Sequence, residues 1–228
     1  MFRTLIFDLD DTLLDTSRLL IPQAERESCA AMVDAGLSAD VEACLSVRKK
    51  LIKQNLRTQI FEATVNELGV REGFNPTEVA KAGSRAFYER EVESNIYLEP
   101  EVMHLLEKMK SKYELFLVTA GSVKTQKQKV EILKIAPFFK KLIYVDLSMG
   151  QTKAQAFKQV SELTQTPPEN ILSIGDRIDT DVAGAKTLGM KTCWVVKGEF
   201  AKLRPLTPVE EPDFRVKQVT EIEAVCQL

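Results

Sequence analysis

The stretch that decides the fold is LIFDLDDT, residues 5–12, in which three apolar residues run into a segment that carries three aspartates. A short apolar run is typical of a buried strand, and aspartate is a poor strand former, so the strand is predicted to end at about Phe7. Asp8 and Asp10 then stand at the carboxyl end of that strand. Two carboxylates about 4 Å apart repel by roughly 4 kcal/mol at an effective dielectric constant of about 20, so the pair requires a cation, a proton or a wide separation in water.

Beyond Pro100, short apolar runs alternate with segments of helical periodicity. The runs predict strands at residues 115–118, 142–145, 170–174 and 192–196, and the periodic segments predict helices at 101–110, 123–133, 153–163 and 181–188. Strands that alternate with helices imply parallel βαβ crossovers. We therefore expect an α/β fold with a doubly wound, mainly parallel sheet.

Residues 19–94 have a different character, with charged and apolar residues at helical spacing and almost no strand pattern. A chain of 228 residues corresponds to about 1.5 domains at roughly 150 residues per domain. The helical block is therefore predicted to be an all-helical insertion placed just after the first strand.

Polar residues also follow two of the later predicted strands. Thr119 follows the run at 115–118, and Asp176 follows the run at 170–174. Ligands bind doubly wound sheets at the carboxyl ends of the strands, so these residues are expected to gather with Asp8 and Asp10. Carboxylate oxygens are hard ligands that suit Mg²⁺. The alternative is that each aspartate caps the helix that follows it.

The composition excludes several other kinds of site. A net charge of −2 argues against a protein that coats a nucleic-acid polymer. The single histidine, His104, rules out a metal site with two histidines, and we expect it at the surface or in packing. The four cysteines contain no Cys-x-x-Cys pair and are predicted to be buried thiols of a reducing compartment. With no signal-peptide pattern and no apolar stretch of about 18 residues, we expect a cytoplasmic protein without a membrane partner.

Four segments of the chain, in order, resemble the four motifs of the haloacid dehalogenase-like (HAD) superfamily. They are FDLDDTL at 7–13, LVTAG at 117–121, Lys153, and GDRIDTD at 175–181 with Gly184-Ala185 and Gly189-Met190 behind it. The resemblance implies a modified Rossmann core formed by residues 1–14 and 99–228, with a helical cap domain formed by residues 15–98. Gln126, Lys129 and the segment TCWV at 192–195 look closest to the nucleotidase and sugar-phosphate phosphatase branches.

The resemblance also implies the catalytic roles. Asp8 would attack phosphorus and form an aspartyl-phosphate, and Asp10 would protonate the leaving alkoxide and then activate water. Thr119 would hydrogen-bond the transferring phosphoryl group, and Lys153 would neutralise its charge and steady Asp8. Lys158 is a competing candidate for the lysine, since Ala154 stands where many relatives have proline. Ala120 likewise stands where many relatives have asparagine.

The metal site follows from the same resemblance. Asp176 would bind Mg²⁺ beside Asp8 and the main-chain carbonyl of Asp10, and Asp181 would orient the site. Asp179 either supports a metal ligand or caps the helix that begins near Thr180.

The acid at position 10 favours phosphoryl transfer over carbon–halogen hydrolysis, because the dehalogenases that give the superfamily its name have no acid there. We therefore expect a magnesium-dependent phosphatase, monomeric or homodimeric, that acts on a small phosphorylated metabolite such as a sugar phosphate, a nucleotide or a phospho-acid. The alternatives are a phosphomutase of the same superfamily and a non-catalytic module that binds a phosphometabolite.

The predicted cap contains the candidate specificity residues. A basic run comprises Arg48, Lys49, Lys50, Lys53 and Arg57. It either steers an anionic substrate or forms a solvated helix face. Arg18, Gln23 and Arg26 are placed near the junction with the core, where they could reach a substrate.

Overall fold

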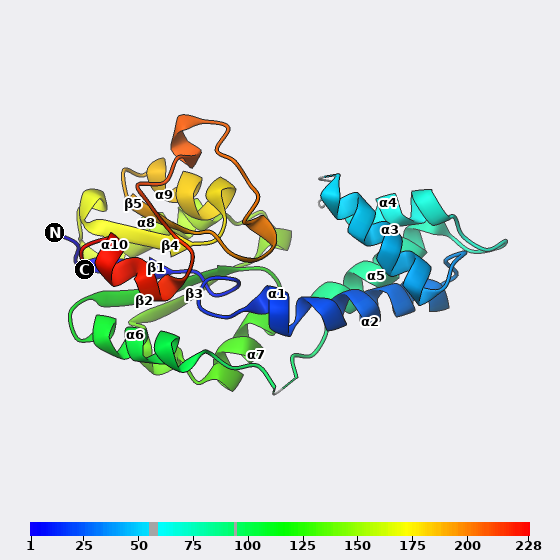
Figure 1. Ribbon diagram of the computed structural model, residues 1–228, viewed down its shortest axis with the longest axis horizontal. Coiled ribbons are helices and arrows are strands. Elements are labelled where there is room, and N and C mark those ends of the chain that lie inside the picture. Colours follow the sequence, from blue (N-terminus) through cyan, green and yellow to red (C-terminus); the bar gives the residue numbers. More distant parts are fainter. Residues whose placement is uncertain (55–58, 94) are drawn as a thin grey trace. The chain divides into compact units, whose positions relative to one another are not determined.

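The computed structural model describes residues 1–54, 59–93 and 95–228, so Arg57 of the basic run lies outside the described residues. The chain divides into two compact units, which are described separately (Figure 1). The larger unit comprises Met1–Leu19 and Val92–Leu228, and the smaller unit is Leu20–Glu91. The smaller unit lies within residues 15–98, and the assignment of that longer range to a cap domain stays a prediction.

Within the described residues, six strands of the larger unit form one sheet, ordered β3-β2-β1-β4-β5-β6, and each neighbouring pair is parallel. The strands are β1 (Thr4–Phe7), β2 (Glu114–Ala120), β3 (Lys141–Val145), β4 (Ile171–Gly175), β5 (Lys191–Val195) and β6 (Phe214–Val216). The predicted doubly wound α/β fold is thereby confirmed. β1 lies at the centre and all four of its residues are buried. Because Phe7 is in register with Leu117 of β2 and Ile174 of β4, the aspartates that follow β1 and β4 meet Thr119, near the end of β2, at one edge.

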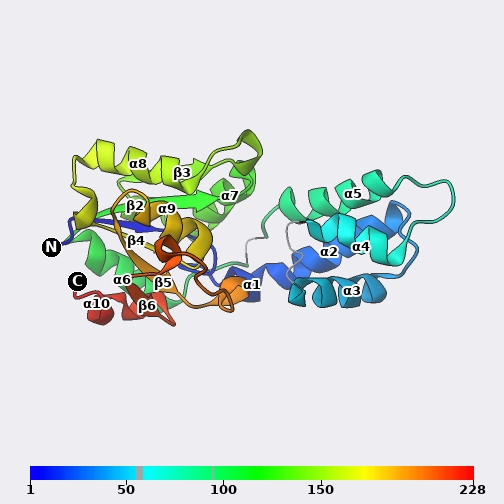
Figure 2. The ribbon, with the colours of Figure 1, turned by 90° about the horizontal axis from the view of Figure 1, so that it is seen from above.

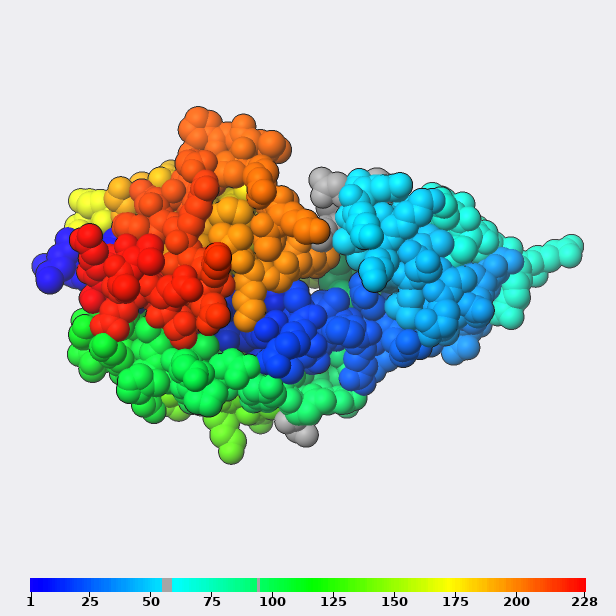
Figure 3. Space-filling model, viewed as in Figure 1, coloured from blue at the N-terminus to red at the C-terminus, as the bar shows by residue number. Residues whose placement is uncertain are grey.

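Helices that connect the strands, together with a helix after the last strand, cover both faces of the sheet. They are α6 (Pro100–Lys110), α7 (Val123–Leu133), α8 (Lys153–Thr164), α9 (Ala183–Lys186) and α10 (Ile222–Val225). Phe157 of α8 and Ala185 of α9 pack with Ile6 and Phe116 in one core cluster. Figure 2 shows α8 on one side of the sheet, with α6 and α10 on the other. The two termini lie side by side on this unit (Figures 1 and 3), away from the carboxyl end of β1.

The structure differs from the predicted helix at 181–188. A π-helical turn spans Ile178–Val182, and α9 continues only to Lys186. Such turns are rare and recur at functional sites, because the extra residue in the turn redirects side chains. The turn carries Asp179 and Asp181.

Helices account for the regular structure in the described part of the smaller unit, as the prediction of a helical insertion after β1 required. They are α2 (Ile21–Asp34), α3 (Val41–Lys53), α4 (Ile60–Leu68) and α5 (Pro76–Tyr88), while the short α1 (Thr16–Leu19) belongs to the larger unit. The side chain of Asp40 caps α3 by accepting from Ala43 N–H at 2.8 Å. Cys29, Met32 and Phe61 lie in the buried core between these helices.

Arg48 fits neither interpretation of the basic run, as solvated residues or as residues that steer an anionic substrate. It is only 2% exposed, and its guanidinium lies 4.7 Å from the centre of the Phe61 ring and donates to Ser28 Oγ at 2.8 Å. Lys50, by contrast, is exposed and pairs with Glu67. Arg48 faces the core because the helical period places it on the face of α3 that also carries Cys44 and Leu51.

The expectations from composition can be compared with the structure directly. The four cysteines are buried and free, as predicted. His104 lies on the exposed face of α6. In the parts of the chain that the structure describes, no helix is long and apolar enough to cross a membrane.

Candidate active site

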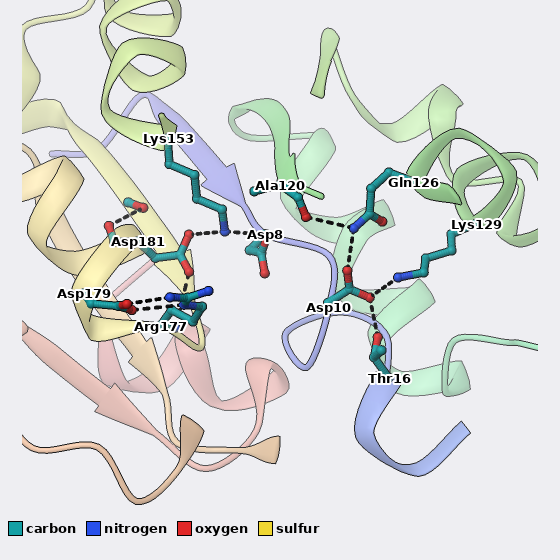
Figure 4. Close-up of polar contacts among 11 residues, drawn as sticks. Asp8, Asp10, Thr16, Ala120, Gln126, Lys129, Lys153, Arg177, Asp179 and Asp181 are labelled. Carbon is teal, nitrogen blue, oxygen red and sulfur yellow. Dashed lines mark hydrogen bonds and ion pairs between the residues drawn. The ribbon is translucent and has the colours of Figure 1, made fainter. Parts of the chain in front are cut away.

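The first two aspartates of the loop after β1, Asp8 and Asp10, point their side chains in different directions (Figure 4). Asp8 N–H donates to Ile174 O at 2.9 Å, which continues the pairing with β4. The chain then turns tightly, and the N–H groups of Leu13 and Leu14 both donate to Leu9 O. The third aspartate, Asp11, accepts from Ser17 N–H at 2.8 Å, in the first turn of α1.

Lys153, at the start of α8, joins Asp8 to Asp181. Its Nζ donates to Asp8 Oδ1 at 2.7 Å and to Asp181 Oδ1 at 2.6 Å, and the three side chains are buried. The competing candidate Lys158 is exposed and lies 3.9 Å from Glu162. Of the two lysines, the structure therefore brings only Lys153 to the end of β1.

Asp176, the residue after β4, completes a buried group of carboxylates. One carboxylate oxygen from each of Asp8, Asp176 and Asp181 lies within 4.8 Å of the other two. The indole N–H of Trp194 donates to Asp176 O at 2.7 Å and fixes the main chain there. Nothing in the local sequence pattern reveals this hydrogen-bond partner of Trp194.

The group carries three carboxylates against the single ammonium of Lys153. Burial, opposed by Lys153 and reinforced by Asp181 and Asp10, raises the pKa of Asp8 to about 7. Burial and the charges of Asp8 and Asp181 also raise the pKa of Asp176. Burial opposes the charge of Lys153, but its two carboxylate partners raise the pKa of its ammonium. Such a cluster of hard oxygen donors, short of positive charge, fits a divalent cation such as Mg²⁺.

Gly175 and the π-helical turn set the position of Asp181. A Cβ atom on Gly175 would lie 2.3 Å from Asp181 Cγ, so only glycine permits this close approach. Asp181 Oδ2 also accepts from Arg177 N–H at 3.3 Å. Asp179 instead accepts from Arg177 Nε at 3.0 Å; this partner lowers its pKa despite partial burial. Asp179 is half exposed and does not join the carboxylate group.

Asp10 has a separate set of donors. Lys129 Nζ donates to its Oδ1 at 2.6 Å, Gln126 Nε2 donates to its Oδ2 at 2.7 Å, and Thr16 Oγ1 also donates to Oδ1. Burial opposes ionisation of Asp10, but Lys129 and the hydrogen bonds outweigh it and lower the pKa. The structure thus keeps the Asp10 carboxylate out of the cluster formed by Asp8, Asp176 and Asp181.

Sequence reasoning assigned no role at the site to Thr16, Gln126 or Lys129. Gln126 and Lys129 lie four residues before the apolar Val130 and Leu133, so polar residues on the apolar face of α7 are the signal that could have identified them.

Thr119 is 1% exposed, and its Oγ1 has no hydrogen-bond partner among the described residues. An unpaired buried hydroxyl costs about 1–3 kcal/mol, so its presence at a strand end needs an explanation. Since β1 and β2 are neighbours, this hydroxyl lies at the same edge of the sheet as Asp8. It fits a donor to an oxygen of a bound group.

The candidate specificity residues are engaged within their own units. Arg18 pairs with Asp15 and Glu99 in the larger unit. Arg26 pairs with Glu42 at 2.8 Å and Gln23 donates to Glu27 at 2.9 Å in the smaller unit. These contacts do not assign any of the three to a substrate.

Comparison with known proteins places this geometry in context. The sequence profile described as haloacid dehalogenase-like hydrolase matches residues 5–195. The chain is similar to glyceraldehyde 3-phosphate phosphatase of Pyrococcus furiosus, with 27% identity over 99% of this chain and 93% of the relative. It is also similar to N-acylneuraminate-9-phosphatase of Rattus norvegicus, with 25% identity over 99% of this chain and 94% of the relative. Among solved structures, the HAD-hydrolase YfnB of Bacillus subtilis bound to magnesium has a similar fold, with a TM-score of 0.66 and 22% identity over 98% of this chain and 97% of that chain.

Proposed function

Since the chain belongs to the haloacid dehalogenase-like hydrolases, we propose that it is a magnesium-dependent phosphatase that hydrolyses a small phosphomonoester through an aspartyl-phosphate on Asp8. The observation that carries the proposal is the buried cluster at the end of β1, in which Lys153 holds Asp8 beside Asp176 and Asp181. The phosphatases among its relatives support the same reaction class.

Asp8 is the proposed nucleophile. Lys153 binds its Oδ1 and so leaves the other carboxylate oxygen to attack phosphorus. In this step the Asp8 oxygen–phosphorus bond forms, the ester phosphorus–oxygen bond breaks, and its electron pair goes to the leaving oxygen.

Asp10 is the proposed proton carrier. In the first step it gives a proton to the leaving oxygen, and in the second it takes one from the water that attacks the aspartyl-phosphate. The second transfer restores the acid for the next turnover. The lowered pKa of Asp10 favours the ionised carboxylate, which is the form that can take a proton from water.

Thr119 and Lys153 stabilise the charge on the transferring group. The unpaired hydroxyl of Thr119 is available as a donor, and the Lys153 ammonium is held beside the attacking oxygen. Asp8 and Asp176, with Asp181 adjacent, are the side chains that would hold Mg²⁺. When bound, the ion supplies charge neutralisation to the nucleophile and the phosphoryl oxygens.

The substrate is proposed to be a small phosphorylated metabolite, because the relatives are named for phosphatases of glyceraldehyde 3-phosphate and an N-acylneuraminate 9-phosphate. The test is phosphate release from a panel of sugar phosphates, nucleotides, phospho-acids and an aryl phosphate with MgCl₂ present. We expect Asp8→Asn to lower turnover at least about a hundredfold, equivalent to about 2.7 kcal/mol of barrier.

The matched control is Asp40→Asn, which makes the same change at the start of α3, where asparagine also caps a helix. It should keep the wild-type rate. An Asp8→Asn protein as active as Asp40→Asn would refute the nucleophile. Conversion of a sugar phosphate to an isomer without free phosphate would instead indicate a phosphomutase.

A further inference from the structure

Lys129 is a buried cation on a helix that connects two strands. Its side chain is 7% exposed, and in the described part of the chain Asp10 is its one carboxylate partner, at 2.6 Å. A buried ammonium requires several kcal/mol of compensation, and here the Asp10 carboxylate supplies it. A lysine exposed to solvent would not need a carboxylate partner, because water would solvate its charge.

Gln126, one turn earlier on α7, complements this contact. Its amide nitrogen bridges Asp10 Oδ2 at 2.7 Å and Ala120 O at 3.0 Å. Its amide oxygen is buried with no partner among the described residues. The orientation of Gln126 therefore satisfies Asp10 and the end of β2 but leaves its own acceptor unpaired.

Together these donors fix both oxygens of Asp10. Lys129 and Thr16 bind Oδ1, and Gln126 binds Oδ2, so the carboxylate plane is defined from two helices of the larger unit. Asp10 remains 28% exposed, whereas Asp8 is 6% exposed. Figure 4 shows the two carboxylates directed away from each other, each toward its own lysine.

We propose that Lys129, with Gln126, is a positioning residue that holds Asp10 for proton transfer. This inference rests on the proposed phosphatase function and deepens it. The contacts keep Asp10 away from the nucleophile and the metal ligands while leaving part of the carboxylate accessible. Lys129 itself touches no reacting atom and acts through Asp10.

With an aryl phosphate as substrate, loss of Lys129 should affect the two chemical steps to different extents. An aryl oxide is a good leaving group, so formation of the aspartyl-phosphate needs little help from an acid. Its hydrolysis still needs a base that takes a proton from water, and a misplaced base slows this step. Loss of Lys129 should therefore let the phosphoenzyme accumulate.

The experiment compares wild-type protein with Lys129→Met and with Lys127→Met, a control on the exposed side of the same helix. Rapid mixing with an aryl phosphate and MgCl₂, followed by acid quenching and intact-protein mass measurement, gives the phosphorylated fraction. For Lys129→Met we expect steady-state turnover to fall at least about tenfold while the phosphorylated fraction rises, since general base catalysis contributes about 10²–10⁴-fold. Lys129→Arg should restore part of the turnover, because it returns a cation to Asp10.

A second variant covers the case in which Lys129→Met does not fold. Gln126→Leu removes the donor to Asp10 Oδ2, together with the hydrogen bond to Ala120 O, and leaves Lys129 in place, so it should show the same accumulation to a smaller extent. Turnover and phosphorylated fraction equal to those of Lys127→Met would overturn the positioning role, as would slower turnover of a folded variant without accumulation. A wild-type protein that forms no phosphoenzyme and releases no phosphate would overturn the proposed function and this inference with it.

Discussion

The two sides of the loop after β1 carry the same residue type two positions apart and treat it in opposite ways. On one side, Asp8 is buried with two more carboxylates and shares one ammonium with Asp181, and its pKa is raised to about 7. On the other side, Asp10 has an ammonium of its own and two neutral donors, and its pKa is lowered. The number of cations per carboxylate, together with burial, therefore decides whether the pKa of each acid is raised or lowered.

The largest effect on the free energy of unfolding is expected from removing the ammonium of Lys153, which Asp8 and Asp181 share. Lys153→Met leaves three buried carboxylates without their cation. Removing one partner of a buried ion pair typically costs about 3–5 kcal/mol, and proton uptake by Asp8 should reduce the loss to about 2 kcal/mol without added metal. Denaturant unfolding at neutral pH measures it, and the exposed Lys158→Met serves as the control. Equal stabilities of the two variants would contradict the buried network.

A smaller effect follows from competition between protons and metal on the Asp8 side. The pKa of Asp8 is about 7 in the folded protein and 3.8 ordinarily. Between these two pH values the folded protein therefore binds more protons than the unfolded chain. Metal-free stability from this group falls as the pH rises through this range. Mg²⁺ binds the ionised carboxylates, so it should raise the melting temperature more at about pH 8 than at about pH 5.5.

Melting curves with and without MgCl₂ at the two pH values measure this difference. Asp176→Asn, which removes one carboxylate of the cluster, should abolish the shift. An equal shift at both pH values, or a shift that survives in Asp176→Asn, would place the metal elsewhere.

The smallest effect is expected from a change of Asp179. This residue belongs to the acidic motif at 175–181 but not to the cluster of Asp8, Asp176 and Asp181. Its partner is Arg177, and the side chains of Arg177 and Asp179 are 35% and 46% exposed. Asp179→Asn should change turnover less than about threefold and the free energy of unfolding by less than about 1 kcal/mol, as is usual for exposed ion pairs. Phosphate release and denaturant unfolding check this expectation, and a loss as large as that of Lys153→Met would show that Asp179 supports a ligand.

Much of the fold was predictable because its signals are local. The apolar run before Asp8 predicted β1 to its last residue, and the run at 115–118 predicted the centre of β2, which extends over Glu114–Ala120. The helix expected at 181–188 was wrong in its first part, because the π-helical turn depends on the contacts of Asp181 with Lys153 and Arg177. Helical period alone contains no information about those partners.

The sequence pattern was less informative for the helical unit, Leu20–Glu91. A basic run suggested that Arg48 is solvated, but the packing of α3 buries it against Phe61. Charge composition describes a segment, whereas burial depends on which face of the helix meets the core.

The sequence by itself determined that acids follow β1 and β4 and that a hydroxyl lies near the end of β2, because strand propensity and apolar periodicity act over a few residues. Parallel pairing then brought those strand ends to one edge. Only the tertiary structure decided which cation each aspartate meets: Lys153 is 145 residues from Asp8, and Lys129 is 119 residues from Asp10. Contacts at such separations depend on how helices pack on the sheet, and this packing gives two neighbouring aspartates different electrostatic surroundings.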